Sequence, residues 1–188
     1  MRKLQRKLEA EIKDIRLLIF DVDGVLTDNR MIYISDHQEA KSFSAADGFA
    51  IKAVNSLRDQ APLQFAVISA RHSDLTLARC EELGIRDVHQ KWNKMKVLDD
   101  LTTKHGLKKS QVCYLGNDIP DLLVMEQVGL AICTADSEPE LLDVSHYQTE
   151  RNGGKGCCRE TISFILNARG LNLIEIYRHG LGNVREGP

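Results

Sequence analysis

The sequence lacks a long apolar run, and none of its apolar stretches approaches the length that crosses a membrane. Charged residues from Arg2 onward predict that no signal peptide begins at this N-terminus. There is no C-x-x-C pair, and the six histidines have no metal-ligand spacing. The five cysteines therefore indicate reduced thiols in a cytoplasmic protein. The formal net charge of −2 gives no basic excess, which argues against a nucleic-acid partner.

What remains is an ordinary globular composition, with 188 residues of which 43% are hydrophobic, and this predicts one domain with a substantial core. Buried-strand patterns alternate with helical patterns, which is typical of a doubly wound, Rossmann-like parallel α/β sheet. The predicted strands are Arg16–Phe20, Phe65–Ile68, Asp87–His89, Val112–Leu115 and Leu130–Cys133. Helices are predicted over Ser73–Leu83, from Asn93 to His105 with Gly106 ending it, and from Cys157 or Cys158 to about Ala168.

Three segments lie outside this alternation. Residues 1–14 form a helical candidate whose leucine and isoleucine positions make a narrow apolar stripe. Within the core of residues 15–168, residues 31–43 alternate around a turn-like cluster and predict a β-hairpin flap. Residues 170–188 form a glycine-containing tail with a weak apolar stretch. The space between Thr27 and Ala66 holds only the hairpin and one helix, so no large cap domain is inserted.

The central stretch is Leu17–Asp28, in which four apolar residues run directly into Asp21, with Asp23 two positions later. A buried strand that breaks into a Gly-containing loop places these residues at the carboxyl edge of a parallel sheet, where ligands bind. Two carboxylates at such a short separation repel each other unless a cation or a proton lies between them. The alternative of an Asx-turn with a helix cap explains one of the acids but not both.

Further polar residues follow other predicted strands, namely Ser69 and Asp118, and Lys94 begins a helix. A carboxylate nucleophile, a hydroxyl, a lysine and another acid are the groups that handle a phosphoryl group, and carboxylates favour Mg²⁺. Each residue also has a structural explanation. Ser69 can cap a helix, Lys94 can lie in solvent, and Asp118 and Asp121 can be helix N-terminal acids.

The order of these groups resembles the haloacid dehalogenase superfamily. D-V-D-G-V-L-T from Asp21 is similar to its first motif, V-I-S-A-R to the second, Lys94 to the third-motif lysine, and G-N-D-I-P-D to the fourth. With the G-G-K-G loop at 153–156, the set resembles the small-cap subgroup that contains 3-deoxy-D-manno-octulosonate (KDO) 8-phosphate phosphatase. The departures are Ala70 in place of glycine, and Asn93 and Asn117 where aspartate is common.

The resemblance implies that Asp21 attacks phosphorus and that Asp23 is the general acid and base. It implies Mg²⁺ held by Asp21, the carbonyl of Asp23, and Asp118. Ser69 and Lys94 would bind the phosphoryl oxygens, and Arg71 a carboxylate or phosphate of the substrate. Supporting roles fall to Thr27, Asp28, Asn117 and Asp121, the last as an outer or minor ligand. Gly153, Gly154 and Lys155 either close over the substrate or form only a turn.

The resemblance therefore predicts hydrolysis of a keto-sugar acid phosphate, with KDO 8-phosphate preferred and a nine-carbon nonulosonate 9-phosphate as the alternative. A non-catalytic assembly module, a phosphomutase and a receiver domain are further alternatives. The intact acids argue against the first, the missing cap against the second, and the order of acids and hydroxyl along the chain against the third. Because no cap shields the site, the exposed hairpin and the tail predict an oligomer in which neighbours cover each site. The resemblance implies that this oligomer is a homotetramer.

Overall fold

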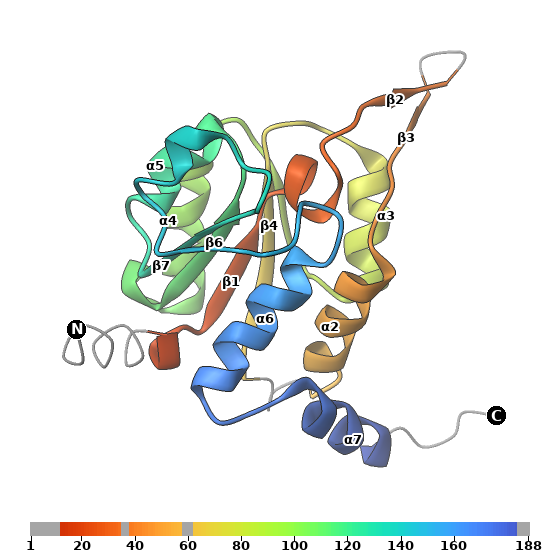
Figure 1. Ribbon diagram of the computed structural model, residues 1–188, viewed down its shortest axis with the longest axis vertical. Coiled ribbons are helices and arrows are strands. Elements are labelled where there is room, and N and C mark those ends of the chain that lie inside the picture. Colours follow the sequence, from red (N-terminus) through yellow and green to blue (C-terminus); the bar gives the residue numbers. More distant parts are fainter. Residues whose placement is uncertain (1–11, 35–37, 58–61, 184–188) are drawn as a thin grey trace.

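The computed structural model describes residues 12–34, 38–57 and 62–183, and the side chains among them up to residue 179. Its centre is a six-stranded sheet in the order β5-β4-β1-β6-β7-β8, in which every neighbouring pair is parallel (Figure 1). The strands are β1 (Leu17–Phe20), β4 (Gln64–Ser69), β5 (Asp87–Gln90), β6 (Val112–Gly116), β7 (Leu130–Cys133) and β8 (Tyr147–Gln148). The predicted doubly wound α/β fold without a large cap is confirmed.

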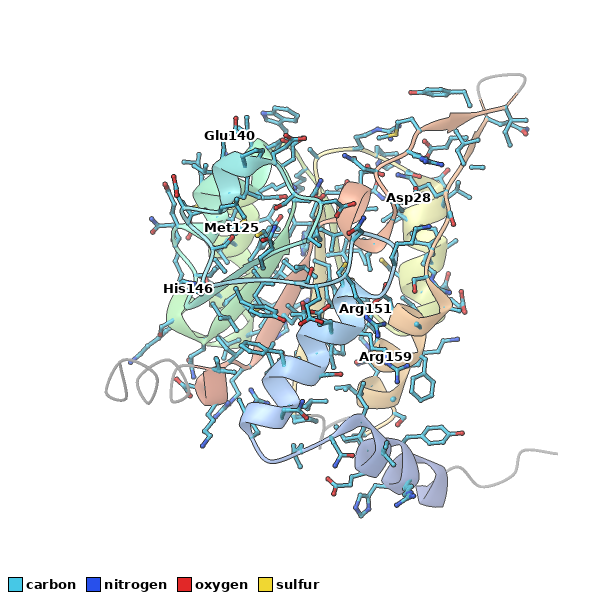
Figure 2. All side chains as sticks on the ribbon, viewed as in Figure 1. Asp28, Met125, Glu140, His146, Arg151 and Arg159 are labelled. Atoms are coloured by element: carbon cyan, nitrogen blue, oxygen red, sulfur yellow. The ribbon has the colours of Figure 1, made fainter. Side chains whose placement is uncertain are left out.

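Helices cover both faces of the sheet because consecutive residues of β1 point to opposite sides. Leu18 and Phe20 pack with one apolar cluster, and Leu17 and Ile19 pack with another. The first cluster includes residues of α2 (Ala45–Asn55), α3 (Asp74–Leu83), α6 (Cys157–Ala168) and α7 (Leu173–Asn183). The second includes residues of α4 (Lys94–His105) and α5 (Leu122–Met125). Side chains fill the space between the layers (Figure 2).

Short helical turns complete the chain: η1 (Val22–Leu26), η3 (Lys109–Gln111), η4 (Ile119–Asp121) and η5 (Pro139–Leu141). No helix in the described ranges is both long and apolar enough to cross a membrane. The helix ends follow local sequence signals. Asn93 caps α4 by accepting a hydrogen bond from the Lys96 amide, and Gly84 and Gly106 end α3 and α4 in left-handed conformation. Helix α2 begins at Ala45, and Ser44 is its N-cap.

The predicted flap is present as β2 (Ile32–Tyr33) paired antiparallel with β3 (Glu39–Ala40), and it projects from the body near the carboxyl edge of the sheet (Figure 1). Its first arm carries exposed apolar side chains from Met31 to Ile34, and Tyr33 is 73% exposed. The turn at 35–37 lies outside the described residues.

Two expectations about the termini have different outcomes. Of the helix predicted over residues 1–14, only residues 12–14 are described, and these are helical. No helix was predicted in the tail at 170–188, but Leu173–Asn183 form helix α7. Leu173 and Ile176 bury their side chains in the core, which gives this helix an apolar face. Figure 1 shows α7 beside α2 at the end of the molecule opposite the hairpin.

The start of α6 is held by a residue from another helix. Its N-cap position is Gly156, which has no side chain to satisfy the first amides. The buried carboxylate of Asp47 in α2 accepts hydrogen bonds from the amides of Gly156, at 3.1 Å, and Arg159, at 2.7 Å. Asp47 therefore caps α6 from outside and fixes the loop that precedes it.

We expect Asp47→Ala to lower the free energy of unfolding by about 2 kcal/mol, because two buried amides lose a charged acceptor. Urea unfolding followed by circular dichroism measures this loss. Asp100→Ala is the control, since Asp100 is an exposed helical residue paired only at 3.4 Å with Lys96, and it should change stability by less than about 0.5 kcal/mol. Equal stability of the two variants would contradict the capping role.

Candidate active site

The candidate site lies at the carboxyl end of the central strand. β1 lies between β4 and β6, and the chain changes its winding direction around β1. In open parallel sheets such a switch point leaves a crevice in which ligands bind. Asp21 directly follows β1 and its amide donates to the carbonyl of Leu115 at 3.0 Å. The predicted residues after β4 and β6 meet it at the same edge.

A buried lysine joins two carboxylates at this edge. The ammonium of Lys94 lies 2.6 Å from a carboxylate oxygen of Asp21 and 2.6 Å from one of Asp121. Lys94 is 5% exposed and Asp121 1%, so the interpretation of Lys94 as a solvated surface residue is excluded. Asp121 also accepts from the hydroxyl of Tyr114 at 2.6 Å and from the amide of Asn117 at 2.9 Å. With its oxygens so occupied, Asp121 holds Lys94 in place.

The charges in this cluster do not balance, because one ammonium faces two carboxylates. Burial and the neighbouring charge of Asp121 raise the pKa of Asp21 to about 7, against the opposing attraction of Lys94. Burial alone would lower the pKa of Lys94, but Asp21 and Asp121 outweigh burial and hold that pKa above its usual value. The cluster thus carries one negative charge in excess, which favours a further cation or a proton.

Asp23 lies in a separate group of charges that faces the hairpin. Its carboxylate forms an ion pair with Lys41, whose side chain is only 3% exposed, and lies 3.7 Å from the guanidinium of Arg71. Arg71 follows β4 and pairs in turn with Glu39 of β3 at 3.1 Å. Asp21 and Asp23 therefore have different cations as partners, although they are two residues apart.

Ser69 ends β4 and is buried. Its hydroxyl accepts from the amide of Arg71 and donates to the carbonyl of Arg71, both at 3.1 Å. This closes a tight turn that carries the guanidinium of Arg71 toward Asp23. Ser69, Arg71 and Asp23 are thus brought together on the hairpin side of the edge.

The glycine-containing loop at 151–156 packs against the acidic loop rather than standing open. The amide of Gly154 donates to the carbonyl of Val25 at 2.9 Å, and a side chain at Gly153 would collide with the backbone of Gly24. Thr27 bridges the same loop through contacts with the Val22 carbonyl and the Gly24 amide. Lys155 is exposed and lies 4.0 Å from Asp28, at the border of this contact.

Asn117 and Asp118 follow β6 and complete the oxygen-rich edge. The side-chain oxygen of Asn117 is buried with no hydrogen-bond partner among the described residues. Asp118 is half-buried and accepts from the amide of Ile119 at 2.6 Å. No three His, Cys, Asp or Glu side chains in the described part form a ready metal cage. The excess negative charge and the unpartnered oxygen nevertheless fit a hard cation that binds oxygen ligands and keeps waters.

Some residues of the site escaped sequence analysis. Tyr114 looked like a core residue of an apolar strand, and the hairpin residues Glu39 and Lys41 looked like solvated charges. The alternation of Glu39 and Lys41, which places both on one face of an extended chain, was a signal that could have shown them. Nothing local in the sequence indicates that Asp47 reaches α6.

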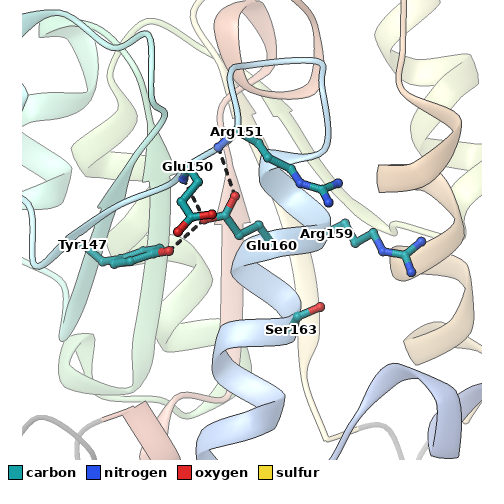
Figure 3. Close-up of a pocket in the computed structure, with 6 residues that line it drawn as sticks. All are labelled: Tyr147, Glu150, Arg151, Arg159, Glu160 and Ser163. Carbon is teal, nitrogen blue, oxygen red and sulfur yellow. Dashed lines mark hydrogen bonds between the residues drawn. The ribbon is translucent and has the colours of Figure 1, made fainter.

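A separate shallow hollow lies along α6, lined by Tyr147, Glu150, Arg151, Arg159, Glu160 and Ser163 (Figure 3). The carboxylate of Glu160 accepts from the hydroxyl of Tyr147 at 2.8 Å and from the amides of Glu150 and Arg151 at 2.8 and 3.1 Å. Burial and Glu160 raise the pKa of Tyr147 to about 12. These contacts anchor the chain that enters the 151–156 loop.

The fold and the site define a class: a parallel α/β protein in which an acidic loop follows the central strand and its first aspartate is paired with a buried lysine. The family model for haloacid dehalogenase-like hydrolases matches residues 27–159. The chain belongs to this haloacid dehalogenase-like hydrolase family, which confirms the predicted resemblance and the assignment as an enzyme.

Relatives of known name agree with this membership. The chain is 36% identical over 162 residues to the 3-deoxy-D-manno-octulosonate 8-phosphate phosphatase KdsC of Escherichia coli K12. The aligned residues cover 86% of this chain and 84% of the relative. The structure of the enzyme of that name from Moraxella catarrhalis, in complex with magnesium, phosphate and KDO, is similar with a TM-score of 0.82 and 31% identity over 96% of this chain and 99% of the other. The structure of the Yersinia pestis enzyme of that name gives a TM-score of 0.81 at 34% identity, over 87% of this chain and 86% of the other.

The unbalanced cluster predicts a pH dependence of stability in EDTA-treated protein. Burial and Asp121 raise the pKa of Asp21 to about 7, whereas an unfolded aspartate titrates near about 3.9. A group with a raised folded pKa stabilises the fold below its unfolded pKa, and this contribution is lost as the pH rises through the folded pKa. Wild type should therefore lose stability relative to Asp21→Asn between about pH 4 and pH 7, by at most about 1.4 kcal/mol per pH unit.

Urea unfolding at a series of pH values measures this difference. Asp100→Asn is the matched control, because Asp100 is exposed and its curve should run parallel to that of wild type. A constant difference between wild type and Asp21→Asn across this range would show that Asp21 is ionised throughout.

Proposed function

We propose that this protein is a Mg²⁺-dependent phosphomonoester hydrolase that converts KDO 8-phosphate to KDO and phosphate. The observation that carries the proposal is the pairing of Asp21 with the buried Lys94 at the end of β1, in a chain 36% identical to KDO 8-phosphate phosphatases. The substrate is a small sugar acid phosphate, the protein acts in the cytoplasm, and its role is the supply of a lipopolysaccharide precursor.

In the mechanism, an oxygen of Asp21 attacks phosphorus and the bond from phosphorus to the sugar oxygen breaks, which leaves an aspartyl phosphate. In its protonated form, Asp23 gives its proton to the departing sugar oxygen and thereby becomes the carboxylate that pairs with Lys41. It then takes a proton from the water that attacks the aspartyl phosphate, which releases phosphate and restores both aspartates. Lys94 keeps Asp21 ionised for the first step by pairing with it at 2.6 Å.

Other residues bind and orient the substrate. Lys94 and Ser69 contact the phosphoryl oxygens, and Arg71 presents its guanidinium to the anionic group of the sugar acid. Asp21, the backbone carbonyl of Asp23, and Asp118 would hold Mg²⁺, with Asp121 behind them, and the bound cation would neutralise charge on the phosphoryl group. Thr27, Asp28 and Asn117 keep the loops at this edge in place, and the loop of Gly153, Gly154 and Lys155 borders it.

The choice of substrate depends on the residue after the second motif. Arg71 is basic, which suits a carboxylated sugar, and the named relatives are KDO 8-phosphate phosphatases. Both points favour KDO 8-phosphate over a nonulosonate 9-phosphate. Since the relatives are enzymes and the cluster of Asp21, Lys94 and Asp121 is complete, a non-catalytic assembly module is not favoured.

The test compares phosphate release with Mg²⁺ from KDO 8-phosphate, a nonulosonate 9-phosphate and p-nitrophenyl phosphate. We expect KDO 8-phosphate to have the highest kcat/KM, and Asp21→Asn to lower it by at least about 10³-fold, because the amide cannot form the acyl phosphate. Asp100→Asn, at an exposed position of α4 outside the proposed catalytic groups, is the control and should retain activity. Full turnover by Asp21→Asn would refute the covalent route, and a preference for the nonulosonate ester would refute the proposed substrate.

We also propose that the working unit is a homotetramer. The first arm of the hairpin exposes Met31, Ile32, Tyr33 and Ile34, and a lone two-stranded ribbon of this kind is marginal in water. Trp92 and Ile119 are also exposed and lie within two positions of the site residues Lys94 and Asp118 in the sequence. They offer an apolar surface for a neighbour's hairpin. Such packing would shield a site that has no cap of its own.

Light scattering at assay concentration should give four times the chain mass for wild type. Replacing Ile32 and Tyr33 by serine should lower the mass, because both side chains are exposed in the single chain and their loss costs the monomer little. Replacing the exposed Leu75 of α3 by serine is the control and should leave the mass unchanged. A monomeric mass for wild type with full activity would contradict the proposal.

A further inference from the structure

The hairpin contacts its own site through a set of alternating charges. Lys41 forms its ion pair with Asp23, and Glu39, two residues earlier, pairs with Arg71. Arg71 also approaches Asp23 at 3.7 Å. The four side chains therefore form a chain of opposite charges from the flap to the site: Lys41, Asp23, Arg71 and Glu39. Residues two apart in an extended segment point to one side, so this segment faces the site with both charges.

Glu39 is also held from the side of α3. Its second carboxylate oxygen accepts from the hydroxyl of Ser73, the residue before α3. Ser73 is buried and is itself fixed, since its amide donates to the side chain of Gln90 at 2.9 Å and its carbonyl accepts from the same side chain at 2.8 Å. The hydrogen bond from Ser73, together with Lys41 and Arg71, lowers the pKa of Glu39. Glu39 is thus a fixed anion anchored to the sheet.

Arg71 is held by the hairpin but still accessible. One nitrogen of its guanidinium pairs with Glu39, and another contacts the thioether of Met31, so residues of both arms of the hairpin contact it. The side chain nevertheless remains 36% exposed. An arginine has several rotatable bonds, and holding its planar group in one pose before binding removes an ordering cost from recognition.

We propose that Glu39 is a positioning residue for substrate recognition: it holds Arg71 in the pose that meets the anionic, non-reacting end of a sugar acid phosphate. This inference rests on the proposed function and deepens it, because it concerns how the same site distinguishes a carboxylated sugar phosphate from a simple phosphate ester. Glu39 acts only through Arg71 and does not touch the reacting atoms.

The experiment compares KM and kcat for two esters: p-nitrophenyl phosphate, which has no carboxylate, and whichever sugar acid phosphate wild type hydrolyses best. Glu39→Gln should raise KM for the sugar acid phosphate about tenfold, since a charge-assisted pair is lost, and should change p-nitrophenyl phosphate kinetics by less than about threefold. Glu82→Gln is the matched control, because Glu82 also pairs with an arginine and a lysine, Arg79 and Lys52, but on the outer surface. It should change neither ester.

A double-mutant cycle separates positioning from a general structural effect. If Glu39 acts through Arg71, the variant with both Glu39→Gln and Arg71→Met should have the KM of Arg71→Met alone within about twofold. The inference would be overturned if the KM increases of the two single variants multiplied in the double variant. It would also be overturned if Glu39→Gln raised KM equally for both esters. Should Glu39→Gln fold poorly, Ser73→Ala leaves the carboxylate present but free to move, and should raise the same KM by about threefold.

Hydrogen–deuterium exchange provides a readout that needs no substrate. Glu39→Gln should increase exchange of the hairpin amides after residue 37, whereas Glu82→Gln should not. Unchanged exchange in Glu39→Gln would overturn the inference that Glu39 anchors the hairpin. The substrate preference of wild type tests the proposed function on its own. If wild type prefers another ester or hydrolyses no sugar acid phosphate, the proposed function fails, whereas the exchange data still decide the inference about Glu39.

Discussion

One buried ammonium shared by two carboxylates is the constraint on which this site depends. Lys94 reaches Asp21 and Asp121 at equal distances, and all three side chains are shielded from water. Charges in such a place are tolerated only when they are paired and hydrogen-bonded. The pairing requires α4 to begin where it does, with Asn93 as its cap, and requires β6 to deliver Asp121 through the turn that follows it. The fold is therefore arranged so that three strand or helix ends meet at one nitrogen.

The charges of that cluster do not balance, and this affects the carboxylate of Asp21. Had Asp121 been absent, Lys94 and Asp21 would form a neutral pair, and Asp21 would be held tightly. Because Asp21 is buried, and because Asp121 competes for the same ammonium and is itself fixed by Tyr114 and the amide of Asn117, the pKa of Asp21 is raised and its charge is incompletely neutralised. A carboxylate in that condition favours a partner of positive character such as phosphorus or a cation. The fixed position of Asp121 thus contributes, together with burial, to the raised pKa of Asp21.

Local patterns in the sequence were sufficient for five strands of the sheet, all except β8, and for the ends of α3, α4 and α6. The strand expected at Leu130–Cys133 is found with those bounds, and α4 begins after Asn93 and ends before Gly106 as predicted. These features depend on side-chain alternation and capping, which involve residues close in sequence. The order of acids, hydroxyl and lysine also located the candidate site, because strands of a parallel sheet all end at one edge.

Contacts between distant segments could not be predicted in the same way. Asp47 lies more than a hundred residues from the amides it caps, and its position in α2 resembles an ordinary first-turn acid. Tyr114 sits in an apolar strand, and only the placement of Asp121 gives its hydroxyl a partner. Helix α7 was missed because the two glycines within it weaken a pattern whose apolar face is short.

The hairpin combines a local feature that the sequence predicts with contacts to distant segments that it does not predict. Its sequence predicts a projecting ribbon, and by that measure it should be a mobile appendage whose only role is to meet a neighbour. The charges at its base change this interpretation, because a buried lysine and an anchored glutamate attach it to the acid and the arginine of its own site. The exposed arm and the charged base lie on one short element. Burial of the arm against another surface would therefore be coupled to the pose of Asp23 and Arg71, because ion pairs connect the hairpin to the candidate site.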